Sequence, residues 1–381
     1  MVASLVRHRR LALTALLVLA CAGGLFSLAS HRRTSVAAAG PPARKAGSEA
    51  VLVLRPAGAY DTLWLVSPAD GTATAAGRLP GHAGTASVSP SGSVAYLPEN
   101  GAPRIWIGYG PLAPRTVSLA GAGVRHIDAL TWVDAGRLLV AGVKTGRAYP
   151  YVDRLFLVDL TSGKTQAFRG LSGAEPSAAP AVGKVAYVSF KRISAGSRTR
   201  PAVWRESLKV LSMEHGGAGR VVWTDQYALG ADHRALSRPQ IAPHGDWFLT
   251  GETGSDVRVT YAVRDSDGMP LLTVFTPALQ AGGGWDATGT RTAFAGSIMD
   301  TGRACVWVYD VASGSLTRSP NGLLPEQMIG DVAWSPSGSL ALGGLVASGS
   351  PAVRHVYVLS AADLGTLKTT AAGELPVWVE R

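Results

Sequence analysis

The sequence contains little cysteine, with two residues among 381, Cys21 and Cys305. Cys21 lies in an apolar N-terminal stretch and Cys305 stands alone on a predicted strand, so we expect no disulfide within the chain. A single cysteine on an apolar strand is typical of a small buried residue and not of a reactive thiol. This scarcity neither supports nor excludes an exported location.

The sequence also lacks the short motifs of the common enzyme classes. It has no Gly-x-Ser-x-Gly nucleophile elbow, no glycine-rich phosphate loop, no His-Glu-x-x-His and no paired Cys-x-x-Cys. The stretch Asp265-Ser266-Asp267-Gly268 resembles the start of a calcium loop but lacks the distal glutamate, and we interpret it as a hairpin turn. We therefore predict no catalytic residue, no metal site and no cofactor.

Charge is scarce at 16% of all residues, although the formal net charge is +10. The first 50 residues hold seven Lys and Arg against Glu49 alone, which leaves +4 for the remaining chain. The basic excess thus belongs mainly to a segment with the layout of a targeting sequence. We predict no nucleic-acid partner, because the rest of the chain has no strong basic bias.

The N-terminus contains a long apolar run, in which the twenty residues from Leu11 to Ser30 carry no charge and basic clusters stand on both sides. This length suits a transmembrane helix. Three interpretations of residues 1–33 stay open: an uncleaved membrane anchor, a lipoprotein signal with lipidation at Cys21, or a signal cleaved after Ala29. All three place the remaining chain outside the cytoplasm, on a single-pass or lipid-anchored protein of the cell membrane. Residues 34–49, rich in Ala, Gly and Pro, are expected to be a flexible linker.

Residues 50–381 contain a repeated phrase. Its clearest copy runs from Trp334 through Ser-Pro-Ser-Gly into two apolar strands, and weaker copies begin near Ala86, Thr131, Pro180, Ile241 and Trp285. A period of roughly 40–50 residues made of strands and turns is typical of a β-propeller. Pro, Gly, Ser and Asp set the backbone angles of the turns between the strands.

Seven such units can be counted, and each is expected to supply four strands, a to d, from the central channel outward. The first unit lacks a strand a, and residues 375–379 match the strand-a pattern of residues 332–334. We therefore predict an all-β propeller of seven four-stranded blades, closed by the C-terminal strand and preceded by an N-terminal hydrophobic helix. Six or eight blades would require one unit to be miscounted. Tryptophans recur at equivalent strand-a positions and are expected to pack between neighbouring blades: Trp132, Trp285, Trp334 and Trp378.

Two phrases connect this pattern with a known family. Trp-Ser-Pro-Ser-Gly-x-x-Ala at residues 334–341 and Trp-Val-Tyr-Asp-Val-x-Ser-Gly at residues 307–314 resemble the repeats of TolB-type propellers. These are similar to WD-repeat blades without the Gly-His and Trp-Asp signatures. Members of this group are extracytoplasmic binding scaffolds of the bacterial cell envelope, so the resemblance implies protein binding without catalysis.

The loops between strands d and a, and those between strands b and c, open on one face of a propeller, where they can surround the channel mouth. Polar residues in or beside the d–a loops are the first candidate binding residues: His82, Arg125, His126, Asp128, His233, Arg234 and Asp331. The histidines come from non-equivalent blades, so they do not predict a metal site.

A long insertion between strands b and c of the fourth unit, residues 191–206, is the second candidate surface. We expect it to lack structure of its own and to point to the same face. Long loops are often functional, and Arg and Trp are favoured at interface hot spots. The insertion carries Lys191, Arg192, Arg198, Arg200, Trp204 and Arg205. Such a basic flap suits an acidic protein, an anionic lipid headgroup or a cell-wall polymer.

These observations predict a membrane-anchored extracytoplasmic propeller that acts as a non-catalytic protein-binding scaffold in the cell envelope. Two alternatives stay open. One is a propeller-type lyase or hydrolase with its site at the channel mouth, and the other is the sensory ectodomain of an envelope signalling system. The enzyme requires carboxylates or histidines that converge in the channel, whereas the innermost strands read as apolar in most units.

Overall fold

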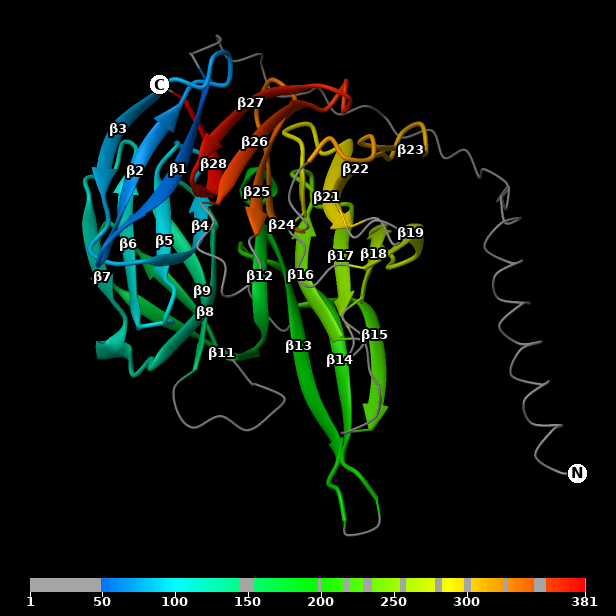
Figure 1. The fold of residues 1–381 in the computed structure, drawn as a ribbon. Helices are drawn as coiled ribbons and strands as arrows, with labels where there is room; N and C mark the ends of the chain where they lie inside the picture. Colours follow the sequence, from blue (N-terminus) through cyan, green and yellow to red (C-terminus); the bar gives the residue numbers. More distant parts are fainter. Residues whose placement is uncertain are drawn as a thin grey trace, which may run out of the picture. The chain divides into compact units, whose positions relative to one another are not determined.

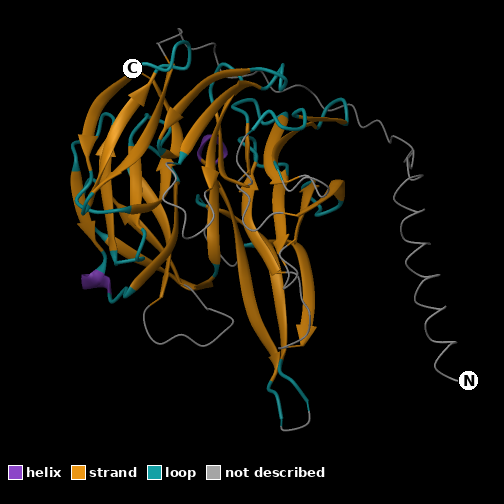
Figure 2. Ribbon diagram, viewed as in Figure 1, coloured by secondary structure: helices purple, strands orange, loops and turns teal. Residues whose placement is uncertain are grey.

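A computed structural model describes residues 49–143, 154–197, 200–214, 219–228, 235–253, 258–277, 283–297, 303–324, 328–345 and 354–380. These residues form seven four-stranded antiparallel sheets and two short 3-10 helices, η1 (Ala120–Ala122) and η2 (Pro180–Val182) (Figures 1 and 2). The predicted anchor at residues 1–33 lies outside the described residues, as does the linker except for Glu49. Among the described residues, no helix has the length and apolar character needed to cross a membrane.

The first three sheets, blades 1 to 3, are numbered in chain order. Blade 1 contains β28 (Glu374–Glu380), β1 (Glu49–Ala57), β2 (Tyr60–Val66) and β3 (Ala73–Arg78). Blade 2 contains β4 (Ala83–Val88), β5 (Val94–Pro98), β6 (Arg104–Tyr109) and β7 (Arg115–Ser118). Blade 3 contains β8 (His126–Trp132), β9 (Arg137–Val143), β10 (Arg154–Asp159) and β11 (Thr165–Ser172).

Blades 4 to 7 follow the same order. Blade 4 contains β12 (Ala174–Ala179), β13 (Lys184–Ser194), β14 (Val203–Ser212) and β15 (Arg220–Ala228). Blade 5 contains β16 (Ala235–Ile241), β17 (Phe248–Thr253), β18 (Arg258–Arg264) and β19 (Pro270–Pro277). Blade 6 contains β20 (Gly283–Trp285), β21 (Arg291–Ser297), β22 (Ala304–Asp310) and β23 (Ser315–Arg318). Blade 7 contains β24 (Met328–Trp334), β25 (Ser339–Leu345), β26 (His355–Ser360) and β27 (Leu367–Ala372).

The innermost strands of the blades meet around a common axis. Each contacts the next in the order β4, β8, β12, β16, β20, β24, β28 and back to β4. The C-terminal strand β28 pairs with β1, with Val51 opposite Trp378 and Leu52 opposite Val377. The predicted propeller of seven blades, closed by the C-terminal strand, is therefore confirmed.

The turns that the sequence predicts between strands a and b have a shared internal geometry. In blade 7 the hydroxyl of Ser335 accepts from the backbone N–H of Ser339 at 2.8 Å, and Gly338 takes φ +84°. In blade 2 the hydroxyl of Ser89 accepts from Ser93 N–H at 2.9 Å, and Gly92 takes φ +85°. The Ser-Pro-Ser-Gly sequence thus specifies the turn through one side-chain bond and one glycine in the left-handed region.

The hydrophobic core lies between the blades and not in one central cluster. One cluster joins blades 2 and 3, with Leu97 and Ile105 against Leu138 and Phe156. The others join blades 1 and 2, 3 and 4, 4 and 5, 7 and 1, and blades 5 to 7. Cys305 belongs to the buried interior of blade 6, and burial raises the pKa of its thiol to about 11, as expected for an unreactive residue.

The four tryptophans at the ends of the innermost strands connect neighbouring blades, as predicted. The indole N–H of Trp132 donates to Ser87 O at 2.9 Å and that of Trp285 donates to Gln240 O at 2.9 Å. Trp334 and Trp378 donate in the same way to carbonyls of the preceding blades, at 2.9 and 3.0 Å. Each bond satisfies an indole donor and a backbone carbonyl at an interface between blades.

The insertion in blade 4 differs from the prediction. Its residues extend strands β13 and β14 into a long hairpin, which projects beyond the neighbouring strands and has β15 alongside (Figure 1). Lys191 pairs with Arg205 and Arg192 with Trp204. Glu206, at the end of the expected loop, is completely buried. The expectation of a loop without structure was wrong because residues 184–194 and 203–212 continue the register of the blade.

We expect the variant Trp132→Phe to lower the free energy of unfolding by about 1 kcal/mol more than Trp106→Phe does, because only Trp132 has a bonded indole N–H. Both side chains are buried, and the Nε1 atom of Trp106 has no hydrogen-bond partner. Urea-induced unfolding of the full chain measures both losses. Equal losses would show that ring volume, and not the bond to Ser87 O, accounts for the effect.

Candidate functional site

The innermost strands are irregular toward their first residues. Six of the seven have a register shift there, on β4, β8, β12, β16, β24 and β28. In three of these bulges a residue other than glycine has a positive φ: Glu175 at 50°, Arg238 at 44° and Leu375 at 47°. A proline follows each of the three. Bulges redirect side chains, and such backbone strain concentrates at functional sites.

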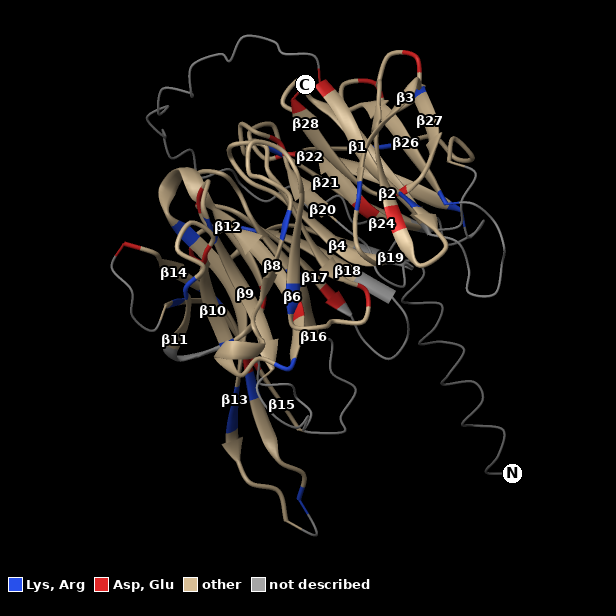
Figure 3. Cartoon of the chain, turned by 90° about the vertical axis from the view of Figure 1, so that its left-hand side faces the viewer, with Lys and Arg blue, Asp and Glu red and all other residues tan. Residues whose placement is uncertain are grey.

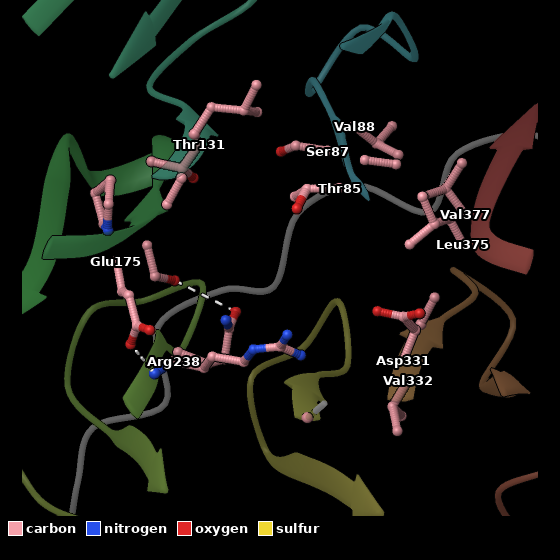
Figure 4. A pocket seen from close by; sticks show the side chains of 18 of the residues that line it. Thr85, Ser87, Val88, Thr131, Glu175, Arg238, Asp331, Val332, Leu375 and Val377 are labelled. Carbon is pink, nitrogen blue, oxygen red and sulfur yellow. Dashed lines mark hydrogen bonds between the residues drawn. The ribbon is translucent and has the colours of Figure 1, made fainter. Parts of the chain in front are cut away.

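The bulged strand ends, together with the strand segments that follow them, line a cavity of about 400 Å³, here named the channel mouth (Figure 4). Four charged side chains from four blades line it: Asp128, Glu175, Arg238 and Asp331. Hydroxyl and amide groups of Thr85, Ser87, Thr131, Ser177 and Gln240 lie beside them, with Val88, Val332, Leu375 and Val377 as apolar wall. A cavity of this size, with a few polar groups on a partly apolar wall, has the character of a ligand site.

Two further hollows adjoin the channel mouth and share Gly84 and Leu375 with its wall. The smaller, of about 120 Å³, adds Arg354 and Glu374, whose side chains form an ion pair. The larger, of about 740 Å³, lies along blades 1, 2 and 7 and adds Arg55, His82 and Glu99. The mouth therefore opens into a polar groove of mixed charge.

The carboxylates of Glu175 and Asp331 in the mouth differ in their hydrogen-bond partners. The carboxylate of Glu175 accepts a hydrogen bond from the backbone N–H of Arg238, so these two bulges hold each other. Burial raises the pKa of Glu175, and the bond and the charge of Arg238 oppose this. Burial also raises the pKa of Asp331, with the charges of Arg238 and Arg354 opposing. Within the described part of the chain, the Asp331 side chain has no hydrogen bond and no ion pair.

The residues predicted beside the d–a loops are only partly brought together. Asp128 and Asp331 line the mouth. His126 forms an ion pair with Asp128 at 3.1 Å, and Arg125 is exposed just before β8. His82 lines the larger hollow, and His233 and Arg234 lie outside the described residues.

Both ring nitrogens of His82 are engaged by residues of blade 1. Its Nδ1 lies 2.8 Å from Asp61 Oδ1, and its Nε2 lies 2.9 Å from Gly58 O. The bond to the buried Asp61 carboxylate raises the pKa of His82. Within the described part of the chain, no group of three His, Cys, Asp or Glu side chains is arranged to hold a metal.

Sequence reasoning missed Glu175, Arg238, Arg354 and Glu374. The expectation that the innermost strands are apolar fails most clearly at their bulged ends, where Glu175, Arg238 and Asp331 line the cavity. A local pattern could have marked two of these residues, because Glu175-Pro176 and Arg238-Pro239 occupy the same place in their blades as Leu375-Pro376. Arg354 and Glu374 could be recognised as neighbours of the site only from the tertiary structure.

The fourth-blade hairpin carries most of the predicted basic residues. Lys191, Arg192 and Arg200 are exposed, whereas Trp204 and Arg205 are half-buried, and Arg198 lies outside the described residues. Lys191 stands directly opposite Arg205. Figure 3 shows Lys and Arg positions, in blue, along the projecting hairpin. Like charges at directly opposed positions destabilise a strand pair unless an anionic group neutralises them.

Comparisons with known proteins concern the fold. No family model matches the sequence, and no curated protein does. The chain is similar to TolB from Acinetobacter baumannii, at 14% identity and a TM-score of 0.45, over 88% of this chain and 83% of that chain. It is also similar to an oligogalacturonate lyase in complex with manganese, at 13% identity and a TM-score of 0.47, over 79% and 82% of the two chains.

A third similar structure is that of prolyl endopeptidases, at 13% identity and a TM-score of 0.46, over 85% of this chain and 42% of that chain. TolB structures are thus among those that share the propeller fold, as the resemblance of the repeats predicts. At such low identities and scores, the likenesses carry no argument about what this chain binds or whether it is an enzyme.

Glu206 is a buried carboxyl close to the mouth. Its Oε1 accepts from the backbone N–H of Leu236 at 3.1 Å, which ties β14 to β16. Burial raises its pKa to about 8, and the charges of Asp225, Glu175 and Glu252 act in the same direction. The folded chain therefore keeps a proton that the unfolded chain releases at a lower pH.

We expect stability to fall as the pH rises from the unfolded pKa of Glu206 toward its folded pKa, because the folded state binds the proton more tightly. The variant Glu206→Gln cannot ionise and should remove this dependence. It should raise the free energy of unfolding at about pH 9 by as much as about 5 kcal/mol and change it little at about pH 5. Urea unfolding at the two pH values measures this, with the exposed Glu214→Gln as the control. A gain of equal size at both pH values would contradict the assignment.

Proposed function

We propose that this protein is a non-catalytic binding scaffold of the cell envelope that is anchored through its N-terminal segment and binds an acidic partner protein at its mouth face. The observation that carries the proposal is the fourth-blade hairpin. It places exposed basic side chains beyond the body of the propeller, at the face where the innermost strands begin. An acidic partner surface would neutralise the opposed charges of Lys191 and Arg205.

The site of chain entry supports this arrangement. Glu49 pairs with Glu380, at the ends of the innermost strands, and its carboxylate accepts from Ser337 N–H at 2.8 Å and from Ser337 Oγ at 2.6 Å. The chain thus enters the propeller on the face opposite the channel mouth. The segment that precedes Glu49 therefore joins the propeller away from the mouth and the hairpin.

The alternative function is an enzyme with its site in the channel mouth. The specific observation in its favour is that the mouth gathers three carboxylates and an arginine, two of the carboxylates with raised pKa values. Perturbed carboxyl groups in a cavity are typical of catalytic sites, and they also occur in binding sites. The scaffold remains the better-supported function because the projecting hairpin has no role in a reaction confined to the channel.

The proposal is tested by crosslinking in cells with tagged full-length protein, followed by capture of the bound partner. The variant Lys191→Ser, Arg192→Ser, Arg200→Ser removes exposed charge from the hairpin and leaves its backbone pairing intact. The matched control removes three exposed basic residues near the opposite face: Lys164→Ser, Arg220→Ser and Lys368→Ser. We expect a partner that is captured by the intact chain and the control, and at least tenfold less by the hairpin variant.

The capture should also weaken as ionic strength rises, because exposed charge pairs are screened by salt. Equal capture by all three proteins would show that the hairpin is not the binding surface. Absence of any partner of the intact chain would overturn the scaffold and favour the enzyme.

A further inference from the structure

The channel mouth holds two opposite charges that face a shared space without pairing. With the described residues, the guanidinium of Arg238 makes one long hydrogen bond, from Nη1 to Gly330 O at 3.4 Å. Among the residues that the structure describes, the carboxylate of Asp331 has no hydrogen-bond or ion-pair partner. Figure 4 shows both side chains directed toward the open part of the cavity, one from blade 5 and the other from blade 7.

The backbone positions from which both side chains project are held by their surroundings. Arg238 stands in a bulge with positive φ, followed by Pro239, and Glu175 accepts its backbone N–H. Asp331 follows the bulge of β24 and lies against Gly343, where an added Cβ would come within 3.2 Å of Asp331 Oδ2. Two opposite charges that project from fixed backbone positions and are left apart are placed to bind a ligand between them.

The composition of the cavity limits what that ligand is. Its volume of about 400 Å³ admits a small organic molecule, and Val88, Val332 and Leu375 offer it apolar contacts. A ligand with a positive charge alone would leave Arg238 unpaired, and one with a negative charge alone would face the carboxylates of Asp128, Glu175 and Asp331. Arg238 is exposed and Asp331 is half-buried, so a ligand with one charge of each sign can pair with both of them and fits better.

We propose that the channel mouth binds a small zwitterion, with Asp331 receiving its ammonium group and Arg238 its carboxylate. Glu175 is a positioning residue that holds the backbone of Arg238. This inference goes beyond the proposed scaffold, since it concerns a small molecule in the channel and does not involve the hairpin.

Titration calorimetry on the full-length protein in detergent tests the proposal. The probes are glycine, γ-aminobutyrate and ε-aminocaproate, which differ in the distance between their charges. Butylamine and butyrate serve as single-charge controls of matched length. We expect at least one of the zwitterions to bind, and to bind at least tenfold more tightly than butylamine or butyrate, because two charge-assisted hydrogen bonds form in place of one.

Two variants identify the residues. Asp331→Asn and Arg238→Gln should each weaken binding of that zwitterion about tenfold or more. The exposed Asp363→Asn and Arg220→Gln should leave it unchanged. Thermal unfolding of each variant verifies that the propeller is folded, and Asp331→Asn removes a carboxylate without changing the size of the side chain.

Three results would overturn the inference: no binding of any of the three zwitterions, binding of butylamine or butyrate as tight as that of the best zwitterion, or unchanged binding in both variants. The hairpin variant described above should bind the zwitterion normally. Failure of this inference is thereby distinguished from failure of the scaffold, because the two use different residues and different readouts.

Discussion

The pairing of the last strand with the first blade is the constraint on which the rest of this structure depends. Strand β28 supplies the innermost strand of blade 1, and the pairing of Ala50–Leu52 with Val377–Val379 joins the first and last strands of the propeller. Closure removes the free inner edge that β1 would otherwise present to other chains. It also places Leu375 beside Gly84, so the wall of the channel mouth is complete only when the ring is closed.

The innermost strands connect neighbouring blades at one end and line the cavity at the other. Their last residues include the tryptophans, whose indole groups bond to the preceding blades and fix the spacing between sheets. Their first residues are bulged, and three of them adopt backbone angles that side chains rarely take. Regular, well-packed halves thus support irregular halves that present Glu175, Arg238 and Asp331 to the cavity. Such strain persists only where the surrounding structure determines it.

The mouth face combines two features of unlike chemistry. The hairpin of blade 4 is basic and exposed, whereas the cavity is lined by three carboxylates around one arginine. The hairpin therefore suits an acidic protein surface, and the cavity suits a small molecule. The fold alone would support either, since propellers serve many functions and the site decides among them.

The sequence by itself determined the architecture: the repeat, the count of seven blades, the closure by residues 375–379 and the tryptophans between blades. Turns such as Ser335 to Gly338 are specified by neighbouring residues, so a single sequence suffices to recognise them. It determined the site only in part, through Asp128, Asp331 and the basic residues of the hairpin.

The tertiary structure decided that Glu175 and Arg238, which are 63 positions apart, hold each other, and that Arg238 reaches Gly330, 92 positions further on. It also decided that the insertion is a paired hairpin with a buried Glu206. The physical reason is that local backbone chemistry sets turns and strands, whereas a site at the axis of a ring is formed by residues that meet only when the ring closes.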